Sequence, residues 1–591
     1  MAPGNALLPR LCLASLRGPS ANNRRLGGQS LQFSGFQGRA LEPVGCDRRE
    51  VSNFGSFCGE THKPFDVNIV YFFSKNHHVQ IHLRIVCLMM LIMVTTPALT
   101  FADAERKFHV RLDPAMGSEI KTGRLIVFLI ADSSKVPKRT SPVDGPFWDD
   151  PQPIFAVEAT LSSNGFATLD DKSDCFPVRP SQLMPGRYRA QARFDLTRAN
   201  SSWRREPGNL WSDEVAFEIR NSGDKQVVEM VLSNVVEKAT SKQVDGVEWF
   251  EIPSKLLSKF RGREVMLRAG IVLPQNYNSE QKYPAIYELP GFGDDHLGAM
   301  RGRPRGSGDT SDAGVLAKSS FRIVLDPEGP NGHSLFADSA NNGPCGQALT
   351  EELISALEAK YPLIAESSAR LLRGHSSGGW STLWLATHYP TVFGATWSSA
   401  PDPVDFRRFQ KVDIYGQKNF YTDANGADLP SLRKGDVVEM TIRQESRGED
   451  VLGPDNTSGQ QWDSWFATFG PKSSSGNPAA LFDVETGKLD SKIAEYYQRY
   501  DICYLLRNNP TELAPIFRNS IRLVVGTEDS FYLNEAVALL DAELNRLGRT
   551  AADRGYVKLI PGDHGSIFAS ETVRSFPKEM LDHLRSAGHV H

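Results

Sequence analysis

The chain has 591 residues, of which 40% are hydrophobic and 23% charged, and its formal net charge is −4 at pH 7. This composition is typical of a soluble globular protein, and the length allows two or three domains. A slightly acidic chain without a long basic stripe lacks the electrostatic footprint of a nucleic-acid-binding protein, so we expect no nucleic-acid partner. The sequence also has no Walker-type phosphate loop, no CxxC motif and no Cys/His cluster with zinc spacing.

The first part of the chain differs from the rest and ends in a segment typical of exported proteins. Residues 1–80 are rich in Arg, Gly and Ser, which is typical of a disordered extension or a misassigned start codon; an organelle transit peptide is the alternative. Residues 82–84 then place a basic side chain ahead of an apolar core of about ten residues, 85–94, and a small-x-small site follows at residues 102–104. We therefore predict a signal sequence at residues 81–104 and a secreted or periplasmic protein.

The apolar run at residues 85–94 is short for a membrane span, so we expect no stable membrane-spanning helix; an uncleaved membrane anchor is the alternative. A start at Met89 or Met90 would lose the basic Arg84, which favours a start codon upstream of that residue. Export would leave three of the seven cysteines in the mature chain, so at most one disulfide can form among Cys175, Cys345 and Cys503.

Residues 105–240 are predicted to form a small all-β sandwich. Short segments that are apolar, or that alternate apolar with polar residues, follow one another between turns, as in two packed antiparallel sheets. The expected strands are residues 123–131, 154–160, 186–193, 214–220 and 226–232. Trp203 and Trp211 could form a sugar platform, but we expect them to be core or loop aromatics. The sequence leaves the role of the domain open between a structural or packing module and a carbohydrate- or surface-binding one.

From residue 250 to residue 588, strands alternate with helices, which predicts βαβ units and a doubly wound, mainly parallel sheet of the α/β class. The expected strands are residues 263–274, 283–289, 321–326, 369–373, 393–398, 521–525 and 556–560, and the expected helices are residues 350–359, 380–388 and 534–547. An interruption at residues 404–509 is rich in Gly, Asp, Asn and Ser, and residues 453–476 within it are predicted to be loop. This insertion could be a lid, a substrate-side wall or a peripheral excursion.

One motif, Gly374-His375-Ser376-Ser377-Gly378, fits the Gly-x-Ser-x-Gly pattern of a nucleophile elbow. The pattern alone is weak in a chain with 49 glycines, but a predicted strand precedes it and a predicted helix follows it. A strained strand–turn–helix junction of this kind exposes the serine hydroxyl and directs backbone N–H groups at the reacting oxygen. We therefore predict Ser376 as the nucleophile, with an ordinary tight turn as the alternative.

A serine nucleophile needs a base that accepts its proton and an acid that orients the base. In α/β-hydrolases the acid and then the histidine follow the serine in the chain. Asp529 and His564 follow the two last predicted strands, so we predict them as acid and base, with Glu528 and Asp563 as the rival acids. We expect His296 and His333 to be surface residues or substrate-side polar groups, because they do not follow late strands.

The negative oxygen that forms during acyl transfer needs two preorganised N–H donors. The first predicted donor is the backbone N–H of Ser377, directly after the nucleophile. The second should come from the loop after the strand that ends at Leu289, where we favour the backbone N–H of Phe292 over that of Gly293.

Together these motifs make residues 251–584 resemble the esterase D-like, or enterochelin esterase-like, family of α/β-hydrolases, which also includes feruloyl and acetylxylan esterases, S-formylglutathione hydrolases and mycolyl transferases. The resemblance rests on residues 272–274, 282–284, 289–293, 337–344, 352–354 and 374–379 and on the Asp529 and His564 segments. It implies a serine carboxylester hydrolase without a metal ion or organic cofactor, in which Ser376, Asp529 and His564 are catalytic and the N–H groups of Phe292 and Ser377 bind the oxyanion. A sandwich ahead of the hydrolase domain is similar to the layout of enterochelin esterases.

The chain departs from that family in two places. Many members have His-Gly in the first oxyanion loop, where this chain has Pro290-Gly291, and the insertion at residues 404–509 is longer than in compact members. We expect an exported esterase that acts on a small-molecule or carbohydrate-linked ester. An acyltransferase to a sugar or lipid hydroxyl and an inactive surface-binding protein are the alternatives, and the sequence leaves the oligomeric state open.

Overall fold

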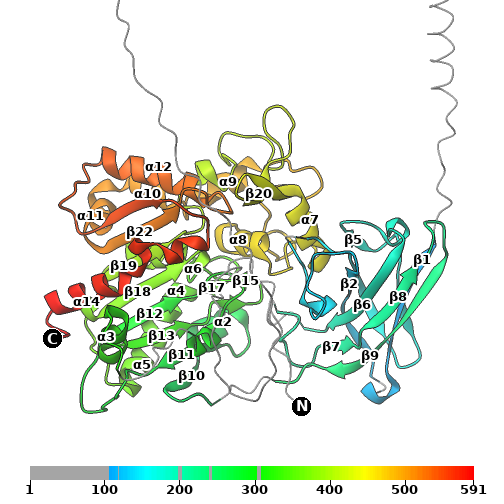
Figure 1. Ribbon diagram of the computed structural model, residues 1–591, viewed down its shortest axis with the longest axis horizontal. Helices are drawn as coiled ribbons and strands as arrows, with labels where there is room; N and C mark the ends of the chain where they lie inside the picture. Colours follow the sequence, from blue (N-terminus) through cyan, green and yellow to red (C-terminus); the bar gives the residue numbers. More distant parts are fainter. Residues whose placement is uncertain (1–104, 118, 149, 198–201, 239–242, 302–307) are drawn as a thin grey trace, which may run out of the picture. The chain divides into compact units, whose positions relative to one another are not determined.

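The chain contains a β-rich domain followed by an α/β domain (Figure 1). The computed structural model describes residues 105–117, 119–148, 150–197, 202–238, 243–301 and 308–591. The predicted extension at residues 1–80 and the predicted signal sequence at residues 81–104 lie outside these residues. No helix of the described part is long and apolar enough to cross a membrane.

The β-rich domain is a sheet of nine strands over the described residues, with the order β4-β1-β9-β7-β6-β2-β3-β5 and with β8 paired to β6. Phe108 on β1 and Phe155 on β3 are not on neighbouring strands, yet their ring centroids lie 5.3 Å apart in one hydrophobic core. Distant strands therefore face one another across this core, as the predicted sandwich requires, and the predicted all-β domain is confirmed. The strands are β1 (Arg106–Leu112), β2 (Lys121–Ala131), β3 (Ile154–Leu161), β4 (Phe166–Leu169), β5 (Asp174–Phe176), β6 (Gly186–Asp195), β7 (Leu210–Ser212), β8 (Val215–Ile219) and β9 (Gln226–Val235).

The α/β domain is built on an eight-stranded sheet with the order β10-β11-β13-β12-β18-β19-β22-β23 within the described residues. The pairs β10–β11 and β11–β13 are antiparallel, and every other neighbouring pair is parallel, so the predicted mainly parallel sheet is confirmed. The sheet begins at Val247, so the predicted domain start at residue 250 falls inside β10 and is three residues late. The strands are β10 (Val247–Pro253), β11 (Met266–Val272), β12 (Ala285–Leu289), β13 (Phe321–Leu325), β18 (Arg370–His375), β19 (Ala395–Ser399), β22 (Ile521–Gly526) and β23 (Tyr556–Ile560).

The helices of this domain connect and cover the parallel strands. The helix α6 packs against β18 and β19, and α3 packs against α14. The predicted helix at residues 350–359 is α5, preceded by a π-helical turn at Ala348–Leu353, and the predicted helix at residues 534–547 is α12. The helices are α2 (Lys255–Arg261), α3 (Asp312–Ser319), α4 (Cys345–Gln347), α5 (Ile354–Lys360), α6 (Ser377–His388), α11 (Pro510–Ser520), α12 (Leu533–Arg546), α13 (Glu571–Arg574) and α14 (Phe576–Ser586).

The insertion at residues 404–509 is more regular than its composition indicates. It contains the hairpin β20 (Pro430–Lys434) and β21 (Val437–Thr441) and the helices α7 (Ile442–Leu452), α8 (Gln461–Phe469), α9 (Ser491–Tyr497) and α10 (Ile502–Asn508). The prediction of a loop at residues 453–476 is wrong, because α8 lies within it. Trp462, Trp465 and Phe469 recur at helical spacing and are all buried, so their burial stabilises the helix despite its loop-like flanks.

The insertion is fixed to the β-rich domain through one face of the strand β2. In β2, Leu125 and Val127 lie in the core of the β-rich domain, while Ile126 and Phe128 lie in a second cluster with Met440, Val451 and Leu452 of the insertion. The buried Arg124 Nη2 donates to the Val451 carbonyl at 2.7 Å. The continuous apolar run of β2 therefore reflects a strand that is covered on both faces.

Two smaller predictions concern single side chains. Trp203 is buried in that second cluster, and its ring stacks on Phe128 with centroids 6.1 Å apart, so it is a core aromatic. In the described part of the chain, Cys175, Cys345 and Cys503 are free thiols.

Candidate active site

Ser376 lies between the end of β18 and the start of α6, at a backbone conformation that serine rarely adopts. Its φ is 58° and its ψ is −126°, and only 3% of the residue is exposed. Its N–H donates to the Ser399 carbonyl at 3.0 Å, and its carbonyl accepts from the Trp380 N–H at 3.0 Å. The neighbouring strand and the first turn of α6 therefore hold the residue at the sharp turn that a nucleophile elbow needs.

The glycines of this motif allow backbone segments to approach closely. A Cβ atom on Gly374 would lie 2.2 Å from the Gly378 carbonyl oxygen, and one on Gly378 would lie 2.0 Å from the Leu289 carbonyl oxygen. The start of α6 thus lies directly against the end of β12. This contact brings Ser377 next to the loop that carries Phe292.

Asp529 and His564 lie in the loops after β22 and β23, and their side chains meet. His564 Nδ1 is 2.7 Å from Asp529 Oδ2, and both residues are buried. Since an ionised carboxylate only accepts hydrogen bonds, Nδ1 carries the proton, and Nε2 is the nitrogen that can act as a base. Of the rival acids, Glu528 is exposed and Asp563 Oδ1 accepts from the Gly565 and Ser566 N–H groups.

The Asp529 carboxylate is held by further hydrogen bonds. Its Oδ1 accepts from the N–H groups of Phe531 at 2.9 Å and Leu533 at 3.3 Å. Arg433 of the hairpin β20–β21 donates from Nε to the Asp529 carbonyl at 2.9 Å. The insertion therefore helps to fix the loop that orients His564.

Ser376 lines a small pocket, and His564 contacts another residue of its lining. Phe531 lines the pocket together with Ser376, and its ring centroid lies 4.9 Å from that of His564. The pocket holds about 20 Å³, which is room for about one water molecule. Its lining consists of Ser376, Asp402, Gln410, Glu445, Gln461, Trp465, Phe531 and Leu533, so half of it comes from the insertion.

The proposed oxyanion groups lie on either side of the contact between β12 and α6. Ser377 is the first residue of α6, and Phe292 lies in the turn closed by the Asp294 N–H and the Gly291 carbonyl at 3.1 Å. Two residues that the sequence did not single out for these roles, Asp402 and His333, hold the two segments in place.

Asp402 is a buried carboxylic acid three residues beyond the end of β19, the strand predicted at residues 393–398. Its Oδ2 accepts from Ser377 Oγ at 2.7 Å and from Trp465 Nε1 at 2.8 Å. Burial raises the pKa of Asp402 to about 6. The position just past the carboxyl end of a parallel strand is the one sequence signal that could have identified it.

His333 is fully buried, so the prediction that it is a surface or substrate-side residue is wrong. Its Nδ1 accepts from the Leu335 N–H at 3.1 Å, so its Nε2–H donates to the Pro290 carbonyl at 2.9 Å. Burial lowers the pKa of His333 to about 4, which keeps the ring neutral and both bonds intact at neutral pH. His333 therefore positions the loop of Pro290 and Phe292. His296 is half-buried and pairs with Asp326 at 3.2 Å.

Glu445, which lines this pocket, is expected to make the stability of the folded protein depend on pH. It is 3% exposed, and burial raises its pKa from 4.5 to about 7. Between these pH values the folded state keeps a proton that the unfolded chain has released, so this residue makes the protein less stable as the pH rises from about 4.5 to about 7. We expect the free energy of unfolding of Glu445→Gln, relative to wild type, to rise by on the order of 2 kcal/mol over this range in urea titrations.

The exposed Glu495→Gln on α9 is the matched control, and its difference from wild type should stay flat with pH. A Glu445→Gln difference that is equally flat would show that the carboxyl is ionised in the folded protein. Within the described residues, no group of three or more His, Cys, Asp or Glu side chains is arranged to hold a metal ion.

Comparison with known proteins gives one family match. The family model described as "Putative esterase" matches residues 264–567, slightly more than half of the chain. No curated protein matches the chain.

Solved structures with a similar chain course share little sequence with this protein. A ferulic acid esterase is 13% identical and covers 57% of this chain and 98% of its own, with a TM-score of 0.35. FphF, a fluorophosphonate-binding serine hydrolase of Staphylococcus aureus, is 13% identical with the same coverage and a TM-score of 0.32. An S-formylglutathione hydrolase from Agrobacterium tumefaciens is 14% identical and covers 58% of this chain and 98% of its own, with a TM-score of 0.30. At these TM-scores the three structures add no argument about the chemistry of this chain.

Proposed function

The chain belongs to the esterase family whose model it matches and is a carboxylic ester hydrolase; from this premise we propose that it is an exported serine esterase that works through Ser376, His564 and Asp529. The observation that carries the proposal is the 2.7 Å contact of His564 Nδ1 with Asp529 Oδ2, beside a pocket that also contains the strained Ser376. A serine, a base and an orienting acid are the groups that acyl transfer to a hydroxyl requires.

The proposed reaction has two steps, formation and hydrolysis of an acyl-enzyme, and His564 acts in both. His564 Nε2 takes the proton of Ser376 Oγ as Oγ bonds to the ester carbonyl carbon, and the N–H groups of Ser377 and Phe292 stabilise the negative oxygen. His564 then returns the proton to the departing alcohol as the carbon–oxygen bond breaks, which leaves an acyl-enzyme. Water, deprotonated by the same nitrogen, attacks the acyl carbon and releases the acid and the free serine.

Export and substrate class rest on the sequence. The basic residue, apolar core and small-x-small site at residues 81–104 support a signal sequence and a secreted or periplasmic location. We propose a small-molecule or carbohydrate-linked ester as substrate. The polar side chains Gln410, Glu445 and Gln461 around the pocket support a polar substrate over a long aliphatic one.

Activity-based labelling tests the mechanism. A fluorophosphonate should modify the protein at Ser376, located by peptide mass spectrometry, and the same preparation should hydrolyse p-nitrophenyl acetate or a feruloyl ester. A folded protein that takes no label and hydrolyses neither ester would instead support the alternative of an inactive surface-binding protein.

One observation favours a second activity, acyl transfer to a sugar or lipid hydroxyl. Ser376 is 3% exposed, and its pocket has room for about one water molecule, so water has little access to an acyl-enzyme formed there. Products formed with and without an acceptor alcohol would separate the two activities. A new ester in the presence of the acceptor indicates a transferase, and free acid alone indicates a hydrolase.

A further inference from the structure

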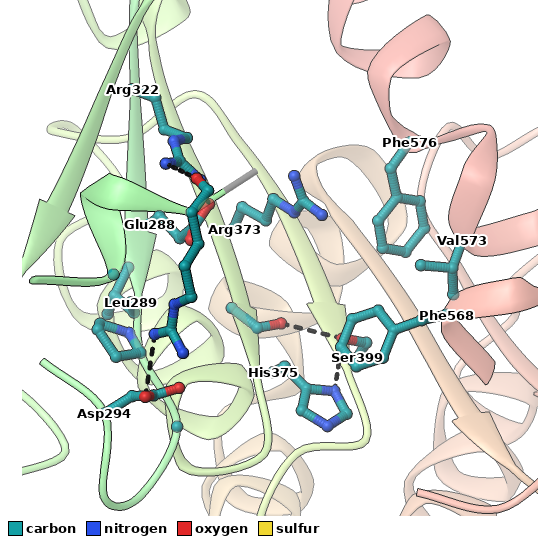
Figure 2. Close-up of a pocket in the computed structure, with 15 residues that line it drawn as sticks. Glu288, Leu289, Asp294, Arg322, Arg373, His375, Ser399, Phe568, Val573 and Phe576 are labelled. Carbon is teal, nitrogen blue, oxygen red and sulfur yellow. Dashed lines mark hydrogen bonds and ion pairs between the residues drawn. The ribbon is translucent and has the colours of Figure 1, made fainter. Parts of the chain in front are cut away.

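A second and larger cavity borders His375, whose ring contacts that of the candidate catalytic histidine. Its volume is about 280 Å³, and the ends of β12, β18 and β19, the segment before residue 302 and the start of α14 line it (Figure 2). The His375 ring borders this cavity and lies 4.5 Å from the His564 ring, whose centroid is 4.9 Å from that of Phe531 of the nucleophile pocket. The two cavities have no lining residue in common.

Three arginines and two carboxylates set the charge of this cavity. Arg322 pairs with Glu288 at 3.5 Å, and Arg301 pairs with Asp294 at 3.0 Å. Arg373 lines the same cavity, and its side chain has neither an ion pair nor a hydrogen bond to any residue that the structure describes. The two pairs cancel, so the cavity carries one unbalanced positive charge.

The neighbours of Arg373 are already engaged or neutral. Glu288 lies directly opposite Arg373 on the adjacent strand, but its carboxylate pairs with Arg322, which also donates to the Ala299 carbonyl at 3.0 Å. The Ser399 hydroxyl donates its hydrogen bond to the Gly374 carbonyl. The hydrogen bond between His375 Nδ1 and Ser399 Oγ, 3.0 Å long, is therefore donated by His375 Nδ1–H. Burial, followed by the neighbouring His564 and Arg373, holds the pKa of His375 well below its usual value, so its ring adds no charge.

The opposite wall of the cavity is apolar. It is formed by Phe568, Val573 and Phe576, and Figure 2 shows the Arg373 guanidinium extending from its strand towards Phe576. A guanidinium left half-buried without a partner matches the fork geometry of a carboxylate. One unbalanced positive charge fits a monoanion better than a phosphate dianion, and an apolar wall fits an anion with an apolar body.

From this arrangement we propose that the cavity is a binding site for a small organic monocarboxylate with an apolar body, held by Arg373 and separate from the pocket of Ser376. The volume lies just below the usual range for small-molecule sites, about 300–1,000 Å³, which limits the ligand to a small acid. The bound acid would lie against His375 and against the Pro290–Gly291 segment, so it contacts both the support of His564 and the proposed oxyanion loop. The site does not depend on the proposed reaction.

Calorimetric titration of the full chain with sodium benzoate tests the proposal, with benzamide as the neutral isostere. We expect saturable benzoate binding, no benzamide binding, and at least about a tenfold rise in Kd in Arg373→Gln. Folding should not depend on Arg373, because it has no partner to lose. The matched control is Arg220→Gln, which removes an exposed arginine of the β-rich domain whose side chain also lacks a described partner. This variant should bind benzoate like wild type.

Further ligands and a second variant keep the test decisive. Acetate, which lacks an apolar body, and inorganic phosphate should both bind more weakly than benzoate. Arg373→Lys keeps the charge but not the fork, so its Kd should lie between those of wild type and Arg373→Gln, and it replaces the glutamine variant if that one fails to fold. Unchanged benzoate binding in the folded Arg373 variant, no benzoate binding by wild type, or tighter binding of phosphate would each overturn the proposal.

Discussion

Replacing Ser376 with alanine is expected to reduce kcat/KM for p-nitrophenyl acetate by at least about 10⁴-fold, to the level of background hydrolysis. His564 would then have no hydroxyl to deprotonate, and no acyl-enzyme could form. The variant should still fold, because the hydrogen bonds that fix the turn are made by the backbone N–H and carbonyl of residue 376 and not by the serine side chain. Initial rates and thermal unfolding of the same preparation check both parts, and an alanine variant with wild-type turnover would remove Ser376 from the mechanism.

Phe292→Leu is the matched control for this prediction. The proposed role of Phe292 uses only its backbone N–H, so a side chain of similar volume should leave kcat within a fewfold of wild type. A loss as large as that of Ser376→Ala would mean that the buried Phe292 ring, and not its amide, has the decisive role.

Gly378→Ala is expected to cause the second-largest loss of activity, together with a loss of stability. Helix propensity alone predicts the reverse, since alanine in a helix is more stable than glycine by about 1 kcal/mol. The new Cβ, however, would lie 2.0 Å from the Leu289 carbonyl oxygen and 2.6 Å from that of Pro290. Both contacts are to backbone atoms, so the end of β12 must shift, and the loop of Phe292 shifts with it.

We expect a net destabilisation on the order of 1–3 kcal/mol, as for other overpacked sites, and a fall in kcat of at least about 10²-fold as one oxyanion donor moves away. Urea unfolding and steady-state kinetics measure the two effects. The control is Gly223→Ala, whose Cβ would meet nothing within 4 Å and should change neither quantity. A Gly378→Ala protein that is more stable than wild type would show that the strand and the helix are not in contact as described.

The sequence predicted the parts of the fold that depend on local pattern. The parallel strands are short apolar runs, and the elbow is a motif between a strand and a helix, so each is visible without tertiary contacts. Asp529 and His564 could be selected because chain order and strand ends restrict the choice. The structure places these two side chains 2.7 Å apart.

The parts that the sequence missed depend on tertiary contacts. Asp402 and His333 act through atoms far away in the chain, the Trp465 indole and the Pro290 carbonyl, and no local pattern marks such pairs. The helix α8 was not predicted, because its flanks are rich in Gly, Asp and Ser. Other segments of the chain bury Trp462 and Trp465, and this burial stabilises the helix.

Because the insertion packs against β2, the α/β domain depends on the β-rich domain for part of its own packing. The insertion supplies Gln410, Glu445, Gln461 and Trp465 to the pocket, yet it also buries Met440, Val451 and Leu452 with residues of the β-rich domain. A hydrolase domain excised at Val247 would expose those apolar side chains to water and loosen the half of the pocket wall that the insertion supplies. The β-rich domain therefore supports the pocket through the insertion. A fusion protein that uses the catalytic domain should include the β-rich domain as well.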